Sequence, residues 1–152
     1  DVCSSDLLHG TTTLATSRKM DSLSALNSSQ LIDELKKLRS DLLEIEFEMS
    51  GQADIIAQDL HEAVIALARE TITNAIRHGQ ASKLHMLLRW SGKHLEIYAI
   101  DDGRGCKDIS KSMGLSGIEQ RFKQLGGSVS FCSDEDTGFY THVTVPLNRQ
   151  TI

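Results

Sequence analysis

The sequence predicts a two-layer α/β fold in which a mixed β-sheet is covered by helices on one face. Two patterns support this class. Apolar residues recur at helical spacing between residues 56 and 75, and they alternate with polar residues in 44–49, 83–90 and 94–101. The predicted order is helix, strand, helix, two strands, loop, helix and two strands, which is typical of helices layered on a mixed sheet.

The first predicted helix covers residues 30–43, where leucines repeat at intervals of three and four: Leu31, Leu35, Leu38 and Leu42. Residues 44–49, EIEFEM, then place Ile45, Phe47 and Met49 on one face and glutamates on the other. We therefore expect a helix that leads into a strand with one solvated face.

A long amphipathic helix comes next and should end near His78, with Gly79 as its stop. Its core-facing positions are Ile56, Leu60, Val64, Leu67, Thr71 and Ala75. The rest of the chain predicts a hairpin (83–90 with 94–101), a loop (101–114), a helix (115–125) and two closing strands (127–133 and 141–147).

Length and charge narrow the class of protein. A chain of 152 residues suits one domain with an appendage. Its longest apolar run, 63–68, is far shorter than the roughly 20 residues of a membrane helix. The net charge of -5 lacks the basic footprint that binding to phosphate backbones needs. We expect a soluble piece with no nucleic-acid partner.

The cysteines indicate a reducing compartment. Cys3, Cys106 and Cys132 form no CxxC pair and no metal-ligand spacing, and their odd number argues against a disulfide framework. We therefore expect a cytoplasmic location.

The first seven residues, DVCSSDL, can be back-translated into a sequence that resembles a common sequencing-adapter oligonucleotide. We expect residues 1–7 to be non-native. Residues 8–43 then form a helical segment, residues 44–148 the main domain and residues 149–152 a tail.

Polar residues at steps of four mark one face of the long helix. Glu70, Asn74 and His78 share a stripe, because positions four apart are neighbours on a helix. One interpretation is a solvated face. The other is a ligand site, since asparagine is a poor helix former and its place in mid-helix needs a reason.

A second candidate site follows the predicted strand 94–101. Asp101 ends this strand, with Gly103 and Gly105 directly after it, so an acceptor on a rigid element adjoins a backbone that can approach a ligand. The DxGxG pattern also occurs in ordinary turns. A calcium loop is excluded because its further carboxylates are absent.

The third candidate is GLSGIEQR, in which Gly114 and Gly117 flank the start of a predicted helix. Free N–H groups and the helix dipole favour an anion there. Basic residues outnumber acidic ones from residue 104 to 123, which fits an anion: Arg104, Lys107, Lys111, Arg121 and Lys123 against Asp108 and Glu119. A basic surface loop is the alternative interpretation.

Together these segments resemble the GHKL, or Bergerat-fold, ATPase superfamily over residues 44–147. ETITNAIRHGQA resembles its N box, IDDGRG its G1 box and GLSGIEQR its second glycine box. The short lid and the GLxGΦxxR sequence (Φ apolar) resemble the sensor histidine kinases that pair with helix-turn-helix response regulators of the LuxR/NarL type.

The resemblance implies an ATP-binding catalytic domain that transfers the γ-phosphate to a histidine for relay to a response regulator. Asn74 would be the Mg²⁺ ligand, and Glu70 would orient a metal-bound water or act as a base. Asp101 would accept a hydrogen bond from the adenine amino group, with Gly103 and Gly105 leaving room for the base. The remaining implied contacts are to phosphate or the lid: Gly114, Leu115, Ser116 and Gly117, then Arg77, His78, Lys107, Lys111 and Arg121.

This chain departs from the family pattern in two places. The closing strand usually begins Gly-Thr, whereas here Gly138 is followed by Phe139, Tyr140 and Thr141, and Thr141 is the candidate beside the adenine. We also expect the phosphoacceptor histidine to lie outside this chain. His9 is followed by glycine where the family has an acid, and His61 in DLHEA mimics the acceptor motif but lies in the same predicted helix as the N box. The family therefore implies a dimerisation domain with the acceptor histidine, of which residues 8–43 would be the end, and a homodimer in the intact protein. Membrane-spanning sensors often lie upstream in this family.

Two other functions remain open on the same fold. A non-catalytic module would bind ATP only to stabilise a surface for a protein partner. A serine kinase of the anti-sigma-factor type would phosphorylate a different side chain.

Overall fold

A computed structural model of the chain describes residues 26–104, 114–134 and 138–147. Its centre is a five-stranded sheet in the order β1-β2-β3-β5-β4. The strands are β1 (Glu44–Ser50), β2 (Lys83–Trp90), β3 (His94–Asp101), β4 (Ser128–Asp134) and β5 (Gly138–Pro146). β1 and β2 are parallel, and the other neighbours are antiparallel. The predicted mixed sheet is confirmed.

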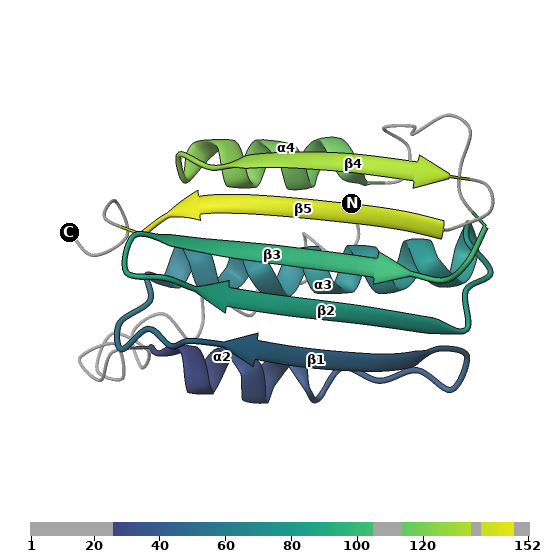
Figure 1. The fold of residues 1–152 in the computed structure, drawn as a ribbon, viewed down its shortest axis with the longest axis horizontal. Coiled ribbons are helices and arrows are strands. Elements are labelled where there is room, and N and C mark those ends of the chain that lie inside the picture. The colour runs from purple at the N-terminus through teal and green to yellow at the C-terminus, as the bar shows by residue number, and fades with distance from the viewer. Residues whose placement is uncertain (1–25, 105–113, 135–137, 148–152) are drawn as a thin grey trace, which may run out of the picture.

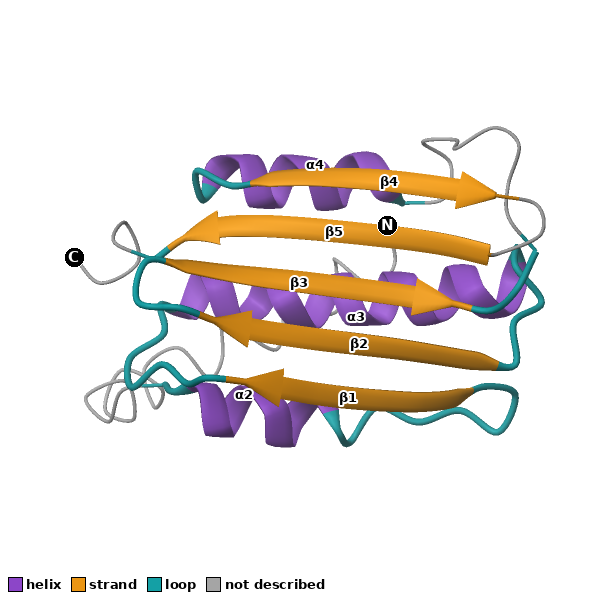
Figure 2. Ribbon diagram, in the orientation of Figure 1, coloured by secondary structure: helices purple, strands orange, loops and turns teal. Residues whose placement is uncertain are grey.

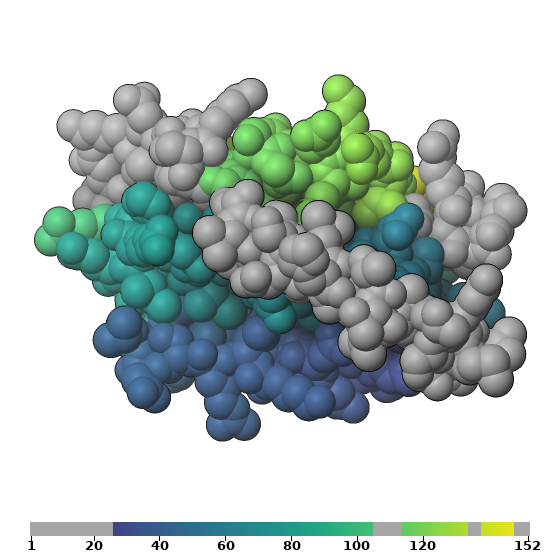
Figure 3. Space-filling model, turned by 180° about the vertical axis from the view of Figure 1, so that it is seen from behind, coloured from purple at the N-terminus to yellow at the C-terminus, as the bar shows by residue number. Residues whose placement is uncertain are grey.

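Three described helices lie on the same face of this sheet: α2 (Ser28–Leu35), α3 (Gln58–Arg77) and α4 (Leu115–Gln124) (Figures 1 and 2). Figure 3 shows the helical side, with α4 in green near the top and the segment that contains α2 in purple to blue below. None of the described helices is both long and apolar enough to cross a membrane.

The core lies between α3 and the sheet. All six apolar positions predicted for the long helix are buried, and so are alternate residues of the hairpin: Leu84, Met86, Leu88, Leu95, Ile97 and Ala99. The helical and two-residue periods in the sequence therefore identified the two layers that pack together.

The first helix is shorter than predicted. α2 ends at Leu35, and the prediction of helix through residue 43 is wrong. Leu42 is 72% exposed, whereas Leu43 is buried at the entry to β1.

Asn27 fixes the start of α2. Its side chain accepts a hydrogen bond from the Gln30 N–H at 2.9 Å, and Gln30 Oε1 accepts one from the Asn27 N–H at 3.0 Å. We expect Asn27→Ala to lower the free energy of unfolding by about 1 kcal/mol, because this capping box satisfies free helix donors. Urea denaturation measures the change. The exposed Ser29→Ala is the control, and equal stability of both variants would contradict the prediction.

The closing strands also differ from the expected bounds. β5 begins at Gly138, three residues before the predicted start at Thr141, and β4 covers Ser128–Asp134. Gly138 has a φ of +95°, and a Cβ there would lie 2.1 Å from the backbone oxygen of Asp101. The early start of β5 therefore depends on a glycine that lets two backbones approach.

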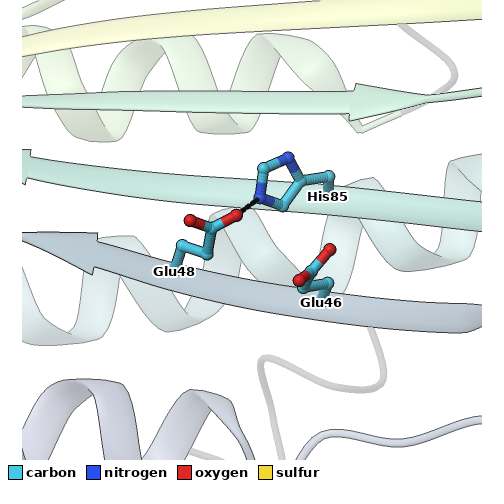
Figure 4. Close-up of side chains that lie close together, drawn as sticks. All are labelled: Glu46, Glu48 and His85. Atoms are coloured by element: carbon cyan, nitrogen blue, oxygen red, sulfur yellow. Dashed lines mark ion pairs between the residues drawn. The ribbon is translucent and has the colours of Figure 1, made fainter.

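The face of the sheet opposite the helices carries polar side chains. On this face Glu46 and Glu48 of β1 lie near His85 of β2 (Figure 4), and His85 Nε2 is 2.5 Å from Glu48 Oε1. One ligand atom from each of the three lies within 4.8 Å of the others. Charged side chains on an edge strand such as β1 discourage pairing with another chain.

Candidate functional site

Asn74 is the most informative residue of the polar stripe on α3. It is 6% exposed, so it does not belong to a solvated face. Its carboxamide nitrogen has no hydrogen-bond partner among the described residues. Buried polar groups normally have partners, so this amide is a group that a ligand would satisfy.

The neighbours of Asn74 along α3 differ in exposure. Glu70, one turn earlier, is half-buried, whereas Arg77 and His78 are exposed at the helix end. The helix ends where predicted, but Gly79 does not have the left-handed conformation of a glycine stop. Gln80 adopts the left-handed conformation instead, with a φ of 49°. The Gly79 N–H instead donates to the Asn74 carbonyl oxygen at 3.0 Å.

Asp101 is held at the end of β3 as a buried acceptor. It is 5% exposed. Its Oδ1 accepts hydrogen bonds from the N–H groups of Gly103 at 2.9 Å and Phe139 at 3.3 Å. Burial raises the pKa of this carboxyl group, against the lowering effect of the two N–H donors. The protein thus holds an acceptor at a buried position, and burial of its charge lowers the stability of the fold.

Gly103 lets the loop after β3 meet the end of α3. A Cβ at Gly103 would lie 2.3 Å from the Gly79 carbonyl oxygen. The Arg104 N–H also donates to that oxygen at 2.6 Å. The role predicted for Gly103, room for a ligand, stays a prediction. In this structure the space admits the protein's own backbone.

Asp102, next to Asp101, has the opposite environment. Its exposed carboxylate accepts hydrogen bonds from the Lys83 N–H at 2.9 Å and from Ser82 Oγ at 2.7 Å. These bonds, the Lys83 N–H first, lower the pKa of Asp102. The Asp102 carboxylate therefore links the end of β3 to the start of β2, outside the candidate site.

We expect Asp102→Asn to lower the free energy of unfolding near neutral pH. A carboxyl group whose pKa falls on folding stabilises the fold above its ordinary pKa, and this contribution is lost as the pH falls through the folded-state pKa. The difference from wild type should therefore shrink between about pH 7 and about pH 3. Urea denaturation at both pH values measures it, and a constant difference would contradict the assignment.

The start of α4 adjoins α3 at Glu70. Gly114 has a φ of +80°, and a Cβ there would lie 2.0 Å from Glu70 Oε1. Leu115 is buried and Ser116 is half-buried. A Cβ at Gly117 would meet nothing within 4 Å. The second glycine segment thus packs against the helix that carries Asn74, with open space at its first turn.

Thr141 lies on the helix-facing side of β5, opposite Ala99. It is 1% exposed, and its hydroxyl has no hydrogen-bond partner in the described part of the chain. Phe139, two residues earlier, lies beside Asp101 and donates its N–H to it. Sequence reasoning missed Phe139, although residues 139, 141, 143 and 145 alternate as one strand face.

Some predicted residues cannot be placed. Gly105, Lys107 and Lys111 lie outside the described residues, as does Cys106. Arg121 is exposed on α4. The described segments nevertheless bring the three motifs together: Asp101 lies near Gly79 after α3, and Gly114 lies against Glu70 of α3.

The chain is similar in sequence to curated sensor histidine kinases. It is 32% identical over 126 residues to the sensor histidine kinase LnrJ of Bacillus subtilis, which covers 80% of this chain and 32% of LnrJ. It is 30% identical over 122 residues to the sensor histidine kinase LiaS of the same organism. This match covers 78% of this chain and 33% of LiaS. The chain spans about a third of the length of these relatives. No protein-family model matches it.

Solved structures agree on the fold. The ATP binding domain of PrrB from Mycobacterium tuberculosis has a TM-score of 0.63 at 22% identity and covers 80% of this chain and 94% of that domain. The blue-light activated histidine kinase EL346 of Erythrobacter litoralis has a TM-score of 0.61 at 18% identity, covering 81% and 41%. The two-layer sheet and helices are thus those of histidine kinase ATP-binding domains.

Proposed function

We infer that this chain, a homologue of the sensor histidine kinases with the fold of their ATP-binding domains, binds Mg·ATP and passes the γ-phosphate to a histidine on a separate segment of the kinase. One observation carries the proposal. Buried Asn74, whose carboxamide nitrogen has no partner among the described residues, lies on the same helix as Glu70, which touches Gly114. Gly79, just after this helix, lies near Asp101. Three distant segments of the sequence therefore converge on one polar site.

The base would bind at the Asp101 end. The outer lone pairs of this carboxylate can accept the adenine amino group, while Gly103 and Phe139 hold its Oδ1 in place. The unpartnered hydroxyl of Thr141 is a further group for the base or an ordered water. Buried acceptors that are already oriented favour a ligand with matching donors.

The phosphates would bind at the start of α4. Free N–H groups of Leu115, Ser116 and Gly117 and the helix dipole favour an anion, and the open space at Gly117 admits one. Arg77 and His78 are exposed at the end of α3, where they can meet the phosphates or the lid. Gly105, Lys107, Lys111 and Arg121 are proposed to contribute to the lid.

Asn74 and Glu70 fit a magnesium ion, since carboxamide and carboxylate oxygens are the hard ligands it prefers. When bound, the ion neutralises phosphate charge. The chain itself contributes position: phosphoryl transfer needs alignment and charge stabilisation more than covalent chemistry. We also propose that Glu70 orients an attacking group or accepts its proton.

Partners and extent follow from the same proposal. We expect a dimerisation domain that carries the acceptor histidine, a homodimeric intact kinase, a response regulator with a helix-turn-helix output, and a cytoplasmic location for this domain. Residues Leu31, Ile32, Leu35 and Leu43 belong to the main core. We propose that the domain begins before residue 44.

Phosphotransfer tests the function. The chain is mixed with radiolabelled Mg·ATP and with a dimerisation domain of a homologous kinase that carries the acceptor histidine. We expect an acid-labile, base-stable phosphohistidine on that domain. Binding of ATP without any phosphohistidine would favour the non-catalytic module, and an acid-stable phosphoserine would favour the serine kinase.

A further inference from the structure

A small apolar cluster lies apart from the main core, next to the proposed nucleotide site. Its buried members are Leu115 at 3% and Phe139 at 8% exposure, with Phe131 packed against them. The rings of Phe131 and Phe139 are 5.9 Å apart at a tilt of 36°. The cluster joins Leu115, the first residue of α4, to Phe139 near the start of β5.

The backbone of Phe139 is fixed at the base end of the site. Its N–H donates to Asp101 Oδ1 at 3.3 Å. The preceding residue, Gly138, lies so close to Asp101 that a Cβ on it would be 2.1 Å from the backbone oxygen of Asp101. Phe139 cannot move away from Asp101 without the loss of this close strand pairing.

The side chain of Phe139 reaches the phosphate end of the site. Leu115, its partner in the cluster, follows Gly114, the N-cap of α4, which has a left-handed conformation and makes no side-chain capping bond. Among the described residues, no side chain therefore caps the first turn of α4. Packing of Leu115 against buried Phe139 helps to set the direction of that turn.

We propose that Phe139 is a positioning residue that couples the two ends of the site. Its amide orients the Asp101 carboxylate, and its ring holds the start of α4 so that the free N–H groups face the phosphates. This inference rests on the proposed function, because it assigns a role within the same nucleotide site. The proposed role belongs to Phe139, which lies beside Asp101.

The two roles separate in an experiment because truncation of the ring leaves the amide. We expect Phe139→Ala to weaken Mg·ATP binding by about tenfold and to leave adenosine binding within about twofold of wild type. Calorimetry measures ATP, and an NMR titration measures adenosine. Phe47→Ala is the matched control, since Phe47 is also 8% exposed but lies in β1. It should leave both affinities unchanged.

A double-mutant cycle tests the contact itself. Leu115→Ala should reproduce the selective loss of ATP affinity, and the double variant should lose little more than either single one. Thermal unfolding and the NMR spectrum establish that each variant is folded. If Phe139→Ala does not fold, the milder Phe139→Leu with Leu115→Ala completes the same cycle.

The outcomes are distinct. Equal losses for ATP and adenosine, additive losses in the cycle, or the same loss in Phe47→Ala would overturn the positioning role while wild-type binding still supports the proposed function. A folded wild-type chain that binds neither ATP nor adenosine would overturn the proposed function and this role with it.

Discussion

Asp101→Asn is expected to abolish adenine-nucleotide binding, with a loss of about 100-fold or more. Asp101 offers only acceptor atoms to a ligand, and its Oδ1 is already engaged by two N–H donors. An asparagine that keeps these two bonds would turn its NH₂ group toward the adenine amino group. Two donors would then face each other in a buried site, which is why the loss should be large.

The same substitution should stabilise the domain when no nucleotide is present. Burial raises the pKa of Asp101, so the folded state binds the proton more tightly than the unfolded state. The ionised group therefore destabilises the fold, and this penalty is absent below the ordinary pKa and complete above the raised one. We expect Asp101→Asn to raise the free energy of unfolding near neutral pH, with the gain vanishing in acid.

Asp102→Asn is the control for both measurements. It changes the neighbouring residue in the same way, but the Asp102 carboxylate binds Ser82 and Lys83 outside the site. Calorimetry should show unchanged ATP binding, and denaturation should show lower stability. ATP binding that survives in Asp101→Asn, or that fails equally in both variants, would remove Asp101 from the proposed base contact.

The sequence predicted best those elements whose pattern is long and regular. The helix from Gln58 to Arg77 has one apolar stripe over its whole length, and the hairpin alternates on both strands, so burial followed the pattern. The leucine repeat of residues 30–43 misled because the chain turns after Leu35. A repeat of four leucines cannot show that the last of them, Leu42, will be exposed.

The site divides in the same way. The sequence singles out Asn74 and Asp101 as candidates because each breaks a local pattern: a polar residue in mid-helix and an acid at a strand end. The approach of Gly103 to Gly79 and of Gly114 to Glu70 was not predictable, since these pairs are distant in sequence and meet only when the layers pack. The sequence does not single out Phe139, because the predicted strand begins at Thr141 and aromatic residues are common in strands.

Asn74→Ala is expected to remove the effect of magnesium on ATP binding and to lower phosphotransfer by about 100-fold or more. The carboxamide nitrogen of Asn74 is buried without a partner in the described structure, so the substitution breaks no hydrogen bond of this nitrogen within the protein. Stability should therefore stay equal or rise. Calorimetry with and without Mg²⁺, and the rate of phosphohistidine formation, measure the two losses.

Two further variants show whether Asn74 acts as a metal ligand. Asn74→Asp keeps an oxygen ligand and should restore part of the magnesium effect, because a carboxylate also binds this hard cation. Asn27→Ala removes an asparagine from the cap of α2 and should cost stability while ATP binding keeps its response to Mg²⁺. If Asn74→Ala binds Mg·ATP as wild type does, or if Asn74→Asp rescues nothing, Asn74 is not the ligand. Loss in Asn74→Ala with rescue in Asn74→Asp would assign the contact with the ion to the side-chain oxygen at position 74, because only the oxygen is common to both side chains.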